Sequence, residues 1–165
     1  MKKLALAVAL LIGSTSLFAQ TGTKSDVPAA NIKSLDGKAF NTATINNDGK
    51  PFIIDFWATW CIPCISQFPH SKKLSDESKD LPIEFIYLCT SESSDTDKWK
   101  TKIAEYKLSG THIFVEKSIE SSLMNIFSAS GYPTYIFINR DGEYQPGVLK
   151  RPSELNKKEL AELLK

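Results

Sequence analysis

Two cysteines three residues apart, Cys61 and Cys64, are the residues of this chain best placed to do chemistry. At the start of a helix, this spacing brings the Cα atoms within the roughly 4.4–6.8 Å that a disulfide needs. Unpaired N–H groups at a helix N-terminus lower the pKa of a thiol from about 8.5, and the thiolate is the attacking species. The pattern predicts that Cys61 is the nucleophile and that Cys64, one turn further on, resolves the mixed disulfide.

Three other interpretations of the cysteine pair have less support. A structural disulfide across four residues closes a loop too small to gain much stability from chain entropy. A zinc site needs more ligands, and the other soft side chains are scattered singly along the chain, at His70, Cys89 and His112. An inert domain that only binds partners is the third. We therefore predict a redox-active Cys61–Cys64 disulfide, with no metal and no cofactor.

An acid lies six residues before the first cysteine, inside an apolar run. Asp55 interrupts the segment PFIIDFWA, residues 51–58. Aspartate is rarely buried without a partner or a purpose. Burial would raise its pKa and let it relay a proton to or from Cys64 during exchange. An aspartate that reaches water at a strand end is the alternative.

The elements that must position these residues follow from hydrophobic periodicity and from turn signals. Runs of strand formers predict strands at 51–58, 83–90 and 111–115. Helices are expected from the cysteine motif to about Lys79, after Asp95 or Thr96, over 119–130 until Gly131, and after Ser153. The pairs Asp36-Gly37 and Asp141-Gly142 predict hairpins over 31–41 and 133–149. Strands that alternate with helices indicate a layered α/β domain.

The first nineteen residues predict an export signal. Lys2 and Lys3 precede an apolar core and a stretch of small residues that ends at Ala19. The apolar core is shorter than the roughly 20 residues that span a bilayer, so we expect cleavage after Ala19 and no stable membrane insertion. An uncleaved N-terminal helix is the alternative. Residues 20–27 are polar and are expected to form a flexible leader before a single domain over 28–165.

The charge balance excludes one class of partner. Removal of the signal would leave 18 basic and 19 acidic side chains, with no basic block that could follow a phosphate backbone. We therefore expect no nucleic-acid binding. Three cysteines are also too few for the disulfide scaffold of a small secreted domain.

The stretch DFWATWCIPC, residues 55–64, resembles the active site of the thioredoxin superfamily, W-C-x-P-C after a strand. The predicted export signal and the length resemble its TlpA/ResA-type thiol-disulfide oxidoreductases, and the resemblance covers about residues 27–150. It implies a thioredoxin fold, an α/β domain whose central mixed β-sheet is flanked by helices, with an N-terminal β-hairpin and an inserted strand-helix element.

The resemblance also assigns residues around the cysteines. In GYPTYIFINRDG, Pro133 matches the cis-proline of the family, which lies beside the cysteines and leaves the preceding backbone free to pair with substrate. An ordinary trans proline is the alternative. Trp60, Ile62, Pro63 and Tyr132 are then expected to line the substrate groove.

The residues that follow Cys64 match the family in one feature and differ from it in another. Pro69 matches a proline that kinks the long active-site helix of the family. The segment CISQFP lacks the basic residue and the glutamate that often follow the second cysteine, and Ile62 adds an apolar side chain. This uncharged rim suits unfolded or hydrophobic protein substrates.

Asp55 matches the buried acid of thioredoxins, with one departure. The family usually pairs that acid with a lysine from the next central strand, whereas residues 81–97 of this chain contain no lysine or arginine. We therefore predict a more strongly raised pKa for Asp55.

The resemblance implies an exported, periplasmic enzyme that exchanges dithiol for disulfide with cysteine-containing protein substrates. Reduction or isomerisation is the expected direction, with electrons from a membrane-embedded thiol reductase. A disulfide-forming oxidase is one alternative, and a non-catalytic thioredoxin-like binding or chaperone module is the other.

Overall fold

The computed structural model describes residues 22–23, 31–33, 39–41, 50–144, 147 and 149–165. In chain order the elements are β1 (Gly22–Thr23), β2 (Asn31–Lys33), β3 (Ala39–Asn41), β4 (Phe52–Trp57), α1 (Ile62–Ile65), α2 (Phe68–Glu77), β5 (Glu84–Thr90), α3 (Thr96–Tyr106), β6 (Thr111–Val115), α4 (Lys117–Ile126), β7 (Thr134–Ile138), β8 (Glu143–Tyr144), a 3₁₀ turn (Pro152–Glu154) and α5 (Lys157–Leu163). The predicted export signal and the Asp36-Gly37 turn lie outside the described residues.

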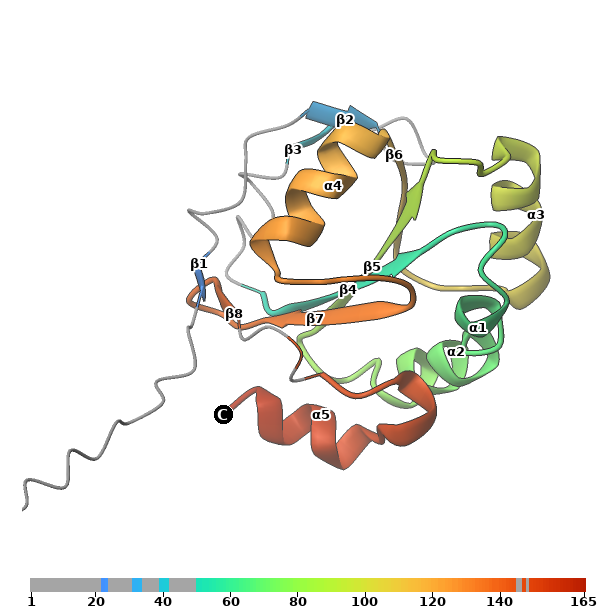
Figure 1. Cartoon of the computed structure of the whole chain (residues 1–165). Helices are drawn as coiled ribbons and strands as arrows, with labels where there is room; N and C mark the ends of the chain where they lie inside the picture. Colours follow the sequence, from blue (N-terminus) through green and yellow to red (C-terminus); the bar gives the residue numbers. More distant parts are fainter. Residues whose placement is uncertain (1–21, 24–30, 34–38, 42–49, 145–146, 148) are drawn as a thin grey trace, which may run out of the picture.

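A mixed sheet forms the centre of the molecule (Figure 1). Its strand order is β1-β8-β7-β4-β5-β6, with β4, β5 and β6 parallel and the other neighbours antiparallel. Strands β2 and β3 form a separate antiparallel hairpin. The predicted thioredoxin fold, with its N-terminal hairpin, is confirmed. The predicted strand-helix insertion lies between β5 and β7, where the chain forms α3, β6 and α4. Strand β1 lies within residues 20–27, which were predicted to form a flexible leader.

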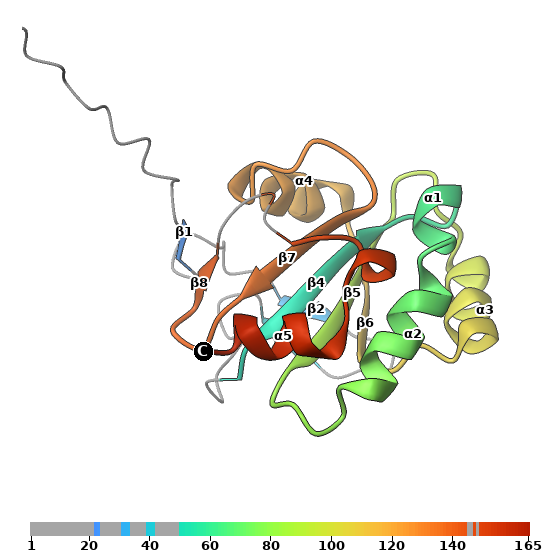
Figure 2. The same cartoon turned by 90° about the horizontal axis from the view of Figure 1, so that it is seen from below.

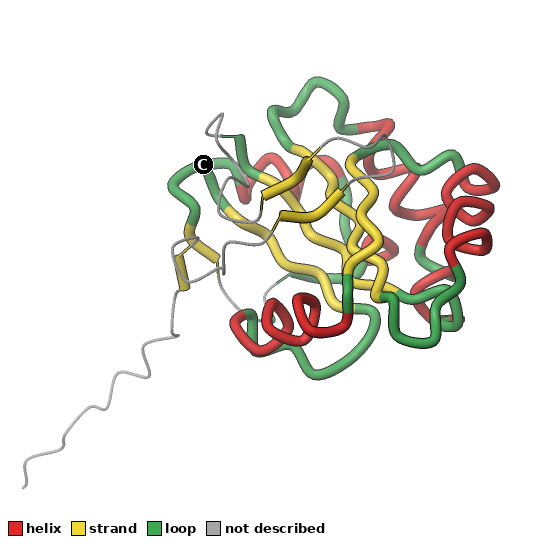
Figure 3. The backbone as a smooth tube through the Cα atoms, turned by 90° about the horizontal axis from the view of Figure 1, so that it is seen from above, coloured by secondary structure: helices red, strands yellow, loops and turns green. Residues whose placement is uncertain are grey.

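Alternation along the central strand β4 divides the interior into two parts, because successive side chains of a strand point to opposite faces. Phe52, Ile54 and Phe56 pack beneath α4 in a cluster of hydrophobic residues. Ile53, Asp55 and Trp57 point to the other face, which α2, α3 and α5 cover. Figure 1 shows α4 above the sheet and α5 below it, and in the view from below α5 lies in front of the more distant α4 (Figure 2). Figure 3 shows the strands in yellow with helices in red around them.

The helix after the cysteines differs from the single long helix that we expected. It consists of α1 and α2, with a break at Ser66 and Gln67. Pro69 has no N–H to donate to the preceding turn, and it lies in the first turn of α2, where a missing N–H costs nothing. The proline therefore divides the helix instead of only bending it.

Two further helix boundaries were predicted wrongly. Helix α4 ends near Phe127 rather than at Gly131, because Ser128 takes a left-handed φ of 51° and the N–H groups of Ser128 and Ala129 bond back to Asn125 and Met124. The terminal helix α5 is capped by Asn156, whose side chain exchanges hydrogen bonds with Glu159, and not by Ser153.

The predicted C-terminal hairpin is present but short. Strands β7 and β8 are joined by a turn over 139–142, in which the Gly142 N–H donates to the Asn139 carbonyl at 3.0 Å. Gly142 has a φ of 81°, which glycine adopts without steric cost. Strand β8, which pairs with β7, has only two residues. The described residues of 145–149 do not extend this strand.

Candidate active site

The two cysteines lie just beyond the C-terminal end of β4. Cys61 is the N-cap of α1, and Cys64 lies within that helix. A disulfide joins the two residues, with a Cα–Cα distance of 5.3 Å. Cys61 is 4% exposed and Cys64 1%. Cys61 is therefore the more accessible of two largely buried cysteines.

One backbone N–H points at the sulfur of Cys61. The Cys64 N–H donates to Cys61 Sγ at 3.2 Å, and the Ile65 N–H donates to the Cys61 carbonyl at 3.1 Å. Pro63 sits in the first turn of α1, where the N–H that it lacks would have no helical partner. An N–H aimed at a sulfur favours its charged form. This geometry suits Cys61 better than Cys64 for the role of attacking thiolate.

The loop before Cys61 is fixed by the segment that follows β5. The Thr59 N–H donates to Ser94 Oγ at 3.1 Å, and the Asp95 N–H donates to Thr59 Oγ1 at 3.2 Å. Trp60 Nε1 donates to the Glu92 carbonyl at 2.9 Å. Three hydrogen bonds thus join two loops that lie more than 30 residues apart in the chain.

The predicted groove residues gather around the cysteines. The Tyr132–Pro133 peptide bond is cis. The ring of Tyr132 meets that of Trp60 edge-on, with centroids 5.6 Å apart and planes at 90°. Trp60 is 50% exposed and Ile62 78%, and Pro63 is exposed beside them. Tyr132 also packs against the buried cluster that contains both cysteines. A half-buried aromatic pair and an exposed isoleucine therefore border the disulfide.

Asp55 lies in the middle of β4, between two tyrosines. The sheet register places it directly beside Tyr87 of β5 and Tyr135 of β7. Its side chain is buried, and neither carboxylate oxygen has a hydrogen-bond partner among the described residues. Burial raises the pKa of Asp55 from 3.8 to about 8. This shift has the direction that the lack of a lysine partner predicts.

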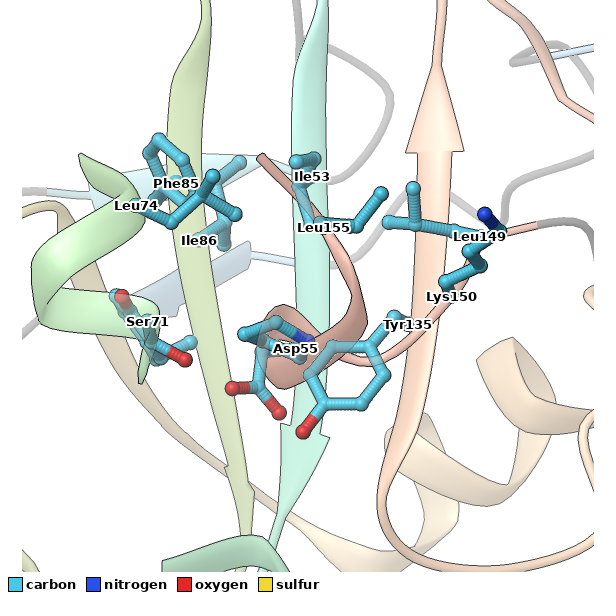
Figure 4. Close-up of a pocket in the computed structure, with 12 residues that line it drawn as sticks. Ile53, Asp55, Ser71, Leu74, Phe85, Ile86, Tyr135, Leu149, Lys150 and Leu155 are labelled. Carbon is cyan, nitrogen blue, oxygen red and sulfur yellow. The ribbon is translucent and has the colours of Figure 1, made fainter. Parts of the chain in front are cut away.

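The cavity beside Asp55 is lined by hydroxyl groups and by one lysine, Lys150, whose ammonium pairs with Glu159. Figure 4 shows its carboxyl beside the Tyr135 hydroxyl, with Ser71 of α2 across from them. Burial, and then the nearby charge of Asp55, raises the pKa of the tyrosines at 87 and 135. The cavity has a volume of about 10 Å³, which is close to the smallest volume that holds one water molecule.

Asp55 faces the same side of the sheet as the cysteine pair. Trp57, two residues further along β4, belongs to the buried cluster that contains Cys61 and Cys64. Two residues of a strand span about 7 Å. The carboxyl therefore lies beneath the cysteines, one side-chain repeat away from a residue that packs with them.

The third cysteine, Cys89, belongs to the same buried cluster as Cys61 and Cys64 but is not part of their disulfide. Cys89 is a fully buried free thiol beside Trp57, and burial raises its pKa to about 12. A thiol that keeps its proton is a poor nucleophile. Cys89 thus packs as a small apolar side chain.

Sequence reasoning missed two residues that shape the site. Ser94 receives the Thr59 N–H, and the buried Glu120 of α4 accepts a hydrogen bond from the Tyr132 hydroxyl. The signal for Glu120 was available, since it precedes Leu123 and Phe127 on the buried face of the same helix. Ser94 lies in a polar loop and gave no such signal.

The described residues contain no group of three or more histidine, cysteine, aspartate or glutamate side chains placed to hold a metal ion. Within the same residues, no helix has the length and apolar character needed to cross a bilayer.

The sequence of this chain is similar to those of known thioredoxin-like proteins. The profile of the Redoxin family matches residues 20–161. The chain is 26% identical over 122 residues to the thiol-disulfide oxidoreductase ResA of Bacillus subtilis, covering 72% of this chain and 63% of that protein. It is 25% identical over 146 residues to the chloroplast thioredoxin-like protein HCF164 of rice, covering 88% of this chain and 45% of that one. The chain thus spans less than two thirds of the length of either relative.

Solved structures share the fold. The thioredoxin domain of a thiol-disulfide oxidoreductase from Bacteroides vulgatus superposes with a TM-score of 0.70 at 22% identity, covering 87% of this chain and 99% of that domain. A secreted disulfide oxidoreductase from Mycobacterium tuberculosis gives a TM-score of 0.62 at 18% identity, with coverages of 84% and 96%. These likenesses support the same arrangement of sheet and helices.

Proposed function

The chain belongs to the Redoxin family, within the thioredoxin superfamily and similar to its ResA members, and we propose that it is a thiol-disulfide oxidoreductase that acts on protein substrates. One observation carries the proposal. The Cys61–Cys64 disulfide lies at the end of a central strand, Tyr132 before the cis bond packs against the cluster that contains it, and the exposed Ile62 lies between the two cysteines. A client cysteine can approach the disulfide from this exposed side. A disulfide with only a structural role would not need exposed apolar residues beside it.

The exchange reaction follows from the positions of the two sulfurs. In the reduced protein, the Cys61 thiolate attacks one sulfur of a client disulfide, and the other client sulfur leaves and takes up a proton. Cys64 then loses its proton and attacks Cys61, which releases the second client thiol and forms the Cys61–Cys64 disulfide. Two electrons and two protons pass to the client.

Asp55 is the proposed proton relay for the second step. Its carboxyl is buried beneath the cysteines, and its pKa of about 8 is close to that of a free thiol. A base whose pKa lies near that of the acid it serves can both accept and return the proton. The tyrosines at 87 and 135 border this carboxyl without contributing a charge at neutral pH.

We propose that the direction is reduction or isomerisation of clients in an extracytoplasmic compartment, the periplasm. A membrane-embedded thiol reductase would then restore the Cys61 and Cys64 thiols by the same exchange in reverse. The W-C-x-P-C motif and the predicted export signal support this direction and location. A potential of the cysteine pair near about −270 mV fits a reductase, whereas about −120 mV would make the protein an oxidase.

A trapping experiment tests the exchange itself. The Cys64→Ser protein cannot resolve its mixed disulfides, so it should accumulate covalent adducts with oxidised client peptides through Cys61. The Cys61→Ser protein is the matched control and should form none. Absence of adducts in the Cys64→Ser protein would favour a domain that binds partners without turnover.

Two measurements test the location and the cellular redox state. Amino-terminal sequencing of the protein recovered from cells should begin at Gln20 if the predicted signal is removed. Alkylation of thiols in intact cells should find Cys61 and Cys64 mostly reduced if the protein is a reductase. A pair found mostly oxidised would support the oxidase alternative.

A further inference from the structure

Glu120 is a buried acid that the exchange reaction does not use. It lies in the first turn of α4 and is 4% exposed. An acid at this position interacts favourably with the helix dipole, but that interaction does not require burial. Its carboxylate accepts a hydrogen bond from the hydroxyl of Tyr132. Glu120 thus contacts the residue that precedes the cis bond to Pro133.

Glu120 reaches the border of the cysteine pair through Tyr132. The Tyr132 hydroxyl is bound to Glu120, while its ring meets Trp60 at a right angle. Trp60 in turn donates its indole N–H to the Glu92 carbonyl, and the Glu92 side chain pairs with Lys117 at the start of α4. Both rings of this pair, which we term the aromatic wall, are thereby linked to the first turn of one helix.

We propose that Glu120 is a positioning residue for client binding: it fixes Tyr132 so that the aromatic wall is already formed when a peptide reaches Cys61. This inference rests on the proposed function and adds a residue from a helix outside the cysteine motif. The clients it concerns are extended peptides with apolar side chains next to a cysteine.

The chemistry of the contact explains why an acid is needed. A hydrogen bond to a carboxylate is stronger than one between neutral groups, so it restrains the ring of a half-buried tyrosine more firmly. The Glu92–Lys117 pair is exposed and contributes little by comparison. A binding surface that is ordered beforehand loses less side-chain entropy when a peptide binds. Loss of the Glu120 contact should therefore weaken client binding without altering the sulfur chemistry.

The test measures steady-state exchange with an oxidised peptide that carries apolar residues beside its cysteines. Glu120→Ala removes the acceptor and should raise KM about fivefold, which corresponds to about 1 kcal/mol, while kcat changes less than twofold. Glu120→Gln keeps an acceptor oxygen but loses the charge, so it should recover only part of the affinity and give a KM between those of the wild type and Glu120→Ala. Glu116→Gln, an exposed residue just before α4, removes the same charge and should leave both constants unchanged.

A double-mutant cycle assigns the effect to Tyr132. Tyr132→Phe should raise KM by a similar factor, and Glu120→Ala combined with Tyr132→Phe should raise it no further than the larger single change. Fully additive effects would overturn the inference, as would a wild-type KM in folded Glu120→Ala protein. A merely structural role would lower the free energy of unfolding and leave the KM of the folded protein unchanged.

Direct binding separates this inference from the proposed function. The dissociation constant of the same peptide is measured in the Cys61→Ser background, where no exchange occurs, with and without Glu120→Ala. A fivefold weaker affinity supports the positioning role even if the wild-type protein shows no turnover, which would overturn the proposed function alone. Equal affinities would overturn the positioning role.

Discussion

The two faces of the central sheet are built for different tasks, although one strand supplies both. On the α4 face, Phe52, Ile54 and Phe56 of β4 are almost completely buried in an apolar cluster. On the opposite face, Asp55 and Trp57 lie beneath the cysteine pair, and the interior there contains several polar groups without partners among the described residues. Burial is similar on both faces, so exposure alone does not distinguish structural residues from functional ones.

The difference shows how a small domain can hold a reactive site without losing its fold. Apolar burial stabilises a fold by roughly 25 cal/mol per Å². An unpaired buried carboxylate acts in the opposite direction, because its charged form has lost its hydration. The cluster under α4 can offset that cost, and the site face can keep a proton-carrying group. The period of two along β4 makes this division possible within six residues.

The largest effect is expected when the nucleophile is removed from the site face. Cys61→Ser should lower the rate of thiol-disulfide exchange at least about 1,000-fold, because no other residue supplies the attacking sulfur. Exchange with an oxidised peptide measures the rate, and circular dichroism checks the fold. Cys89→Ala is the control, since it removes a buried thiol outside the exchanging pair. Residual exchange within tenfold of wild type would contradict the assignment.

A substitution on the α4 face should have the opposite profile. Ile54→Ala should lower the free energy of unfolding by about 2–5 kcal/mol, because it opens a cavity in a closely packed apolar cluster. The protein that remains folded should exchange thiols at nearly the wild-type rate. Denaturant unfolding and single-turnover exchange test the two halves of this prediction. Ile62→Ala provides the matched control, since this exposed isoleucine should change stability by less than about 0.5 kcal/mol.

The pH dependence of stability should reveal the buried acid. Asp55 has a pKa of about 8 when folded and 3.8 ordinarily, so between these values the folded protein holds a proton that the unfolded chain releases. The free energy of unfolding should therefore fall as the pH rises through this window, by about 1.4 kcal/mol per pH unit for one proton. Asp55→Asn should lack this slope.

Guanidinium unfolding of the oxidised proteins at several pH values between about 4.5 and 7.5 measures that difference. Asp97→Asn serves as the control, because it removes an exposed carboxyl in the first turn of α3 and should keep the wild-type slope. Parallel stability curves for wild type and Asp55→Asn would show that the carboxyl at position 55 titrates like a free one.

The smallest expected effect concerns the exposed border of the site. Ile62→Ser should raise KM two- to threefold for a peptide with apolar residues beside its cysteine, since an exposed isoleucine offers contact area to such a client. A peptide with polar flanking residues is the control substrate and should give the same KM with both proteins. An equal change for the two peptides would argue against an apolar preference.

Local sequence patterns predicted many of the secondary-structure elements and the residues of the cysteine site. Strands were predicted at 51–58, 83–90 and 111–115 from continuous runs of strand formers, close to the observed β4, β5 and β6. The start of α3 was predicted at Asp95 or Thr96, and Asp95 is the cap. The roles of the cysteine pair and the burial of Asp55 were predicted from residues close to them in the sequence. Helix ends were less predictable, because a left-handed serine at 128 and the cap at Asn156 depend on backbone geometry that many residues can adopt.

By itself, the sequence determined the residue types of the site and the alternation that places Asp55 and Trp57 on one face of the sheet, since both follow from spacing within one strand and one helix. Only the tertiary structure decided which distant residues meet there. The register of β5 and β7 places two tyrosines beside Asp55, the loop after β5 fixes Trp60, and α4 brings Glu120 to Tyr132. Such contacts depend on strand pairing and helix packing across many residues, and local periodicity does not encode them.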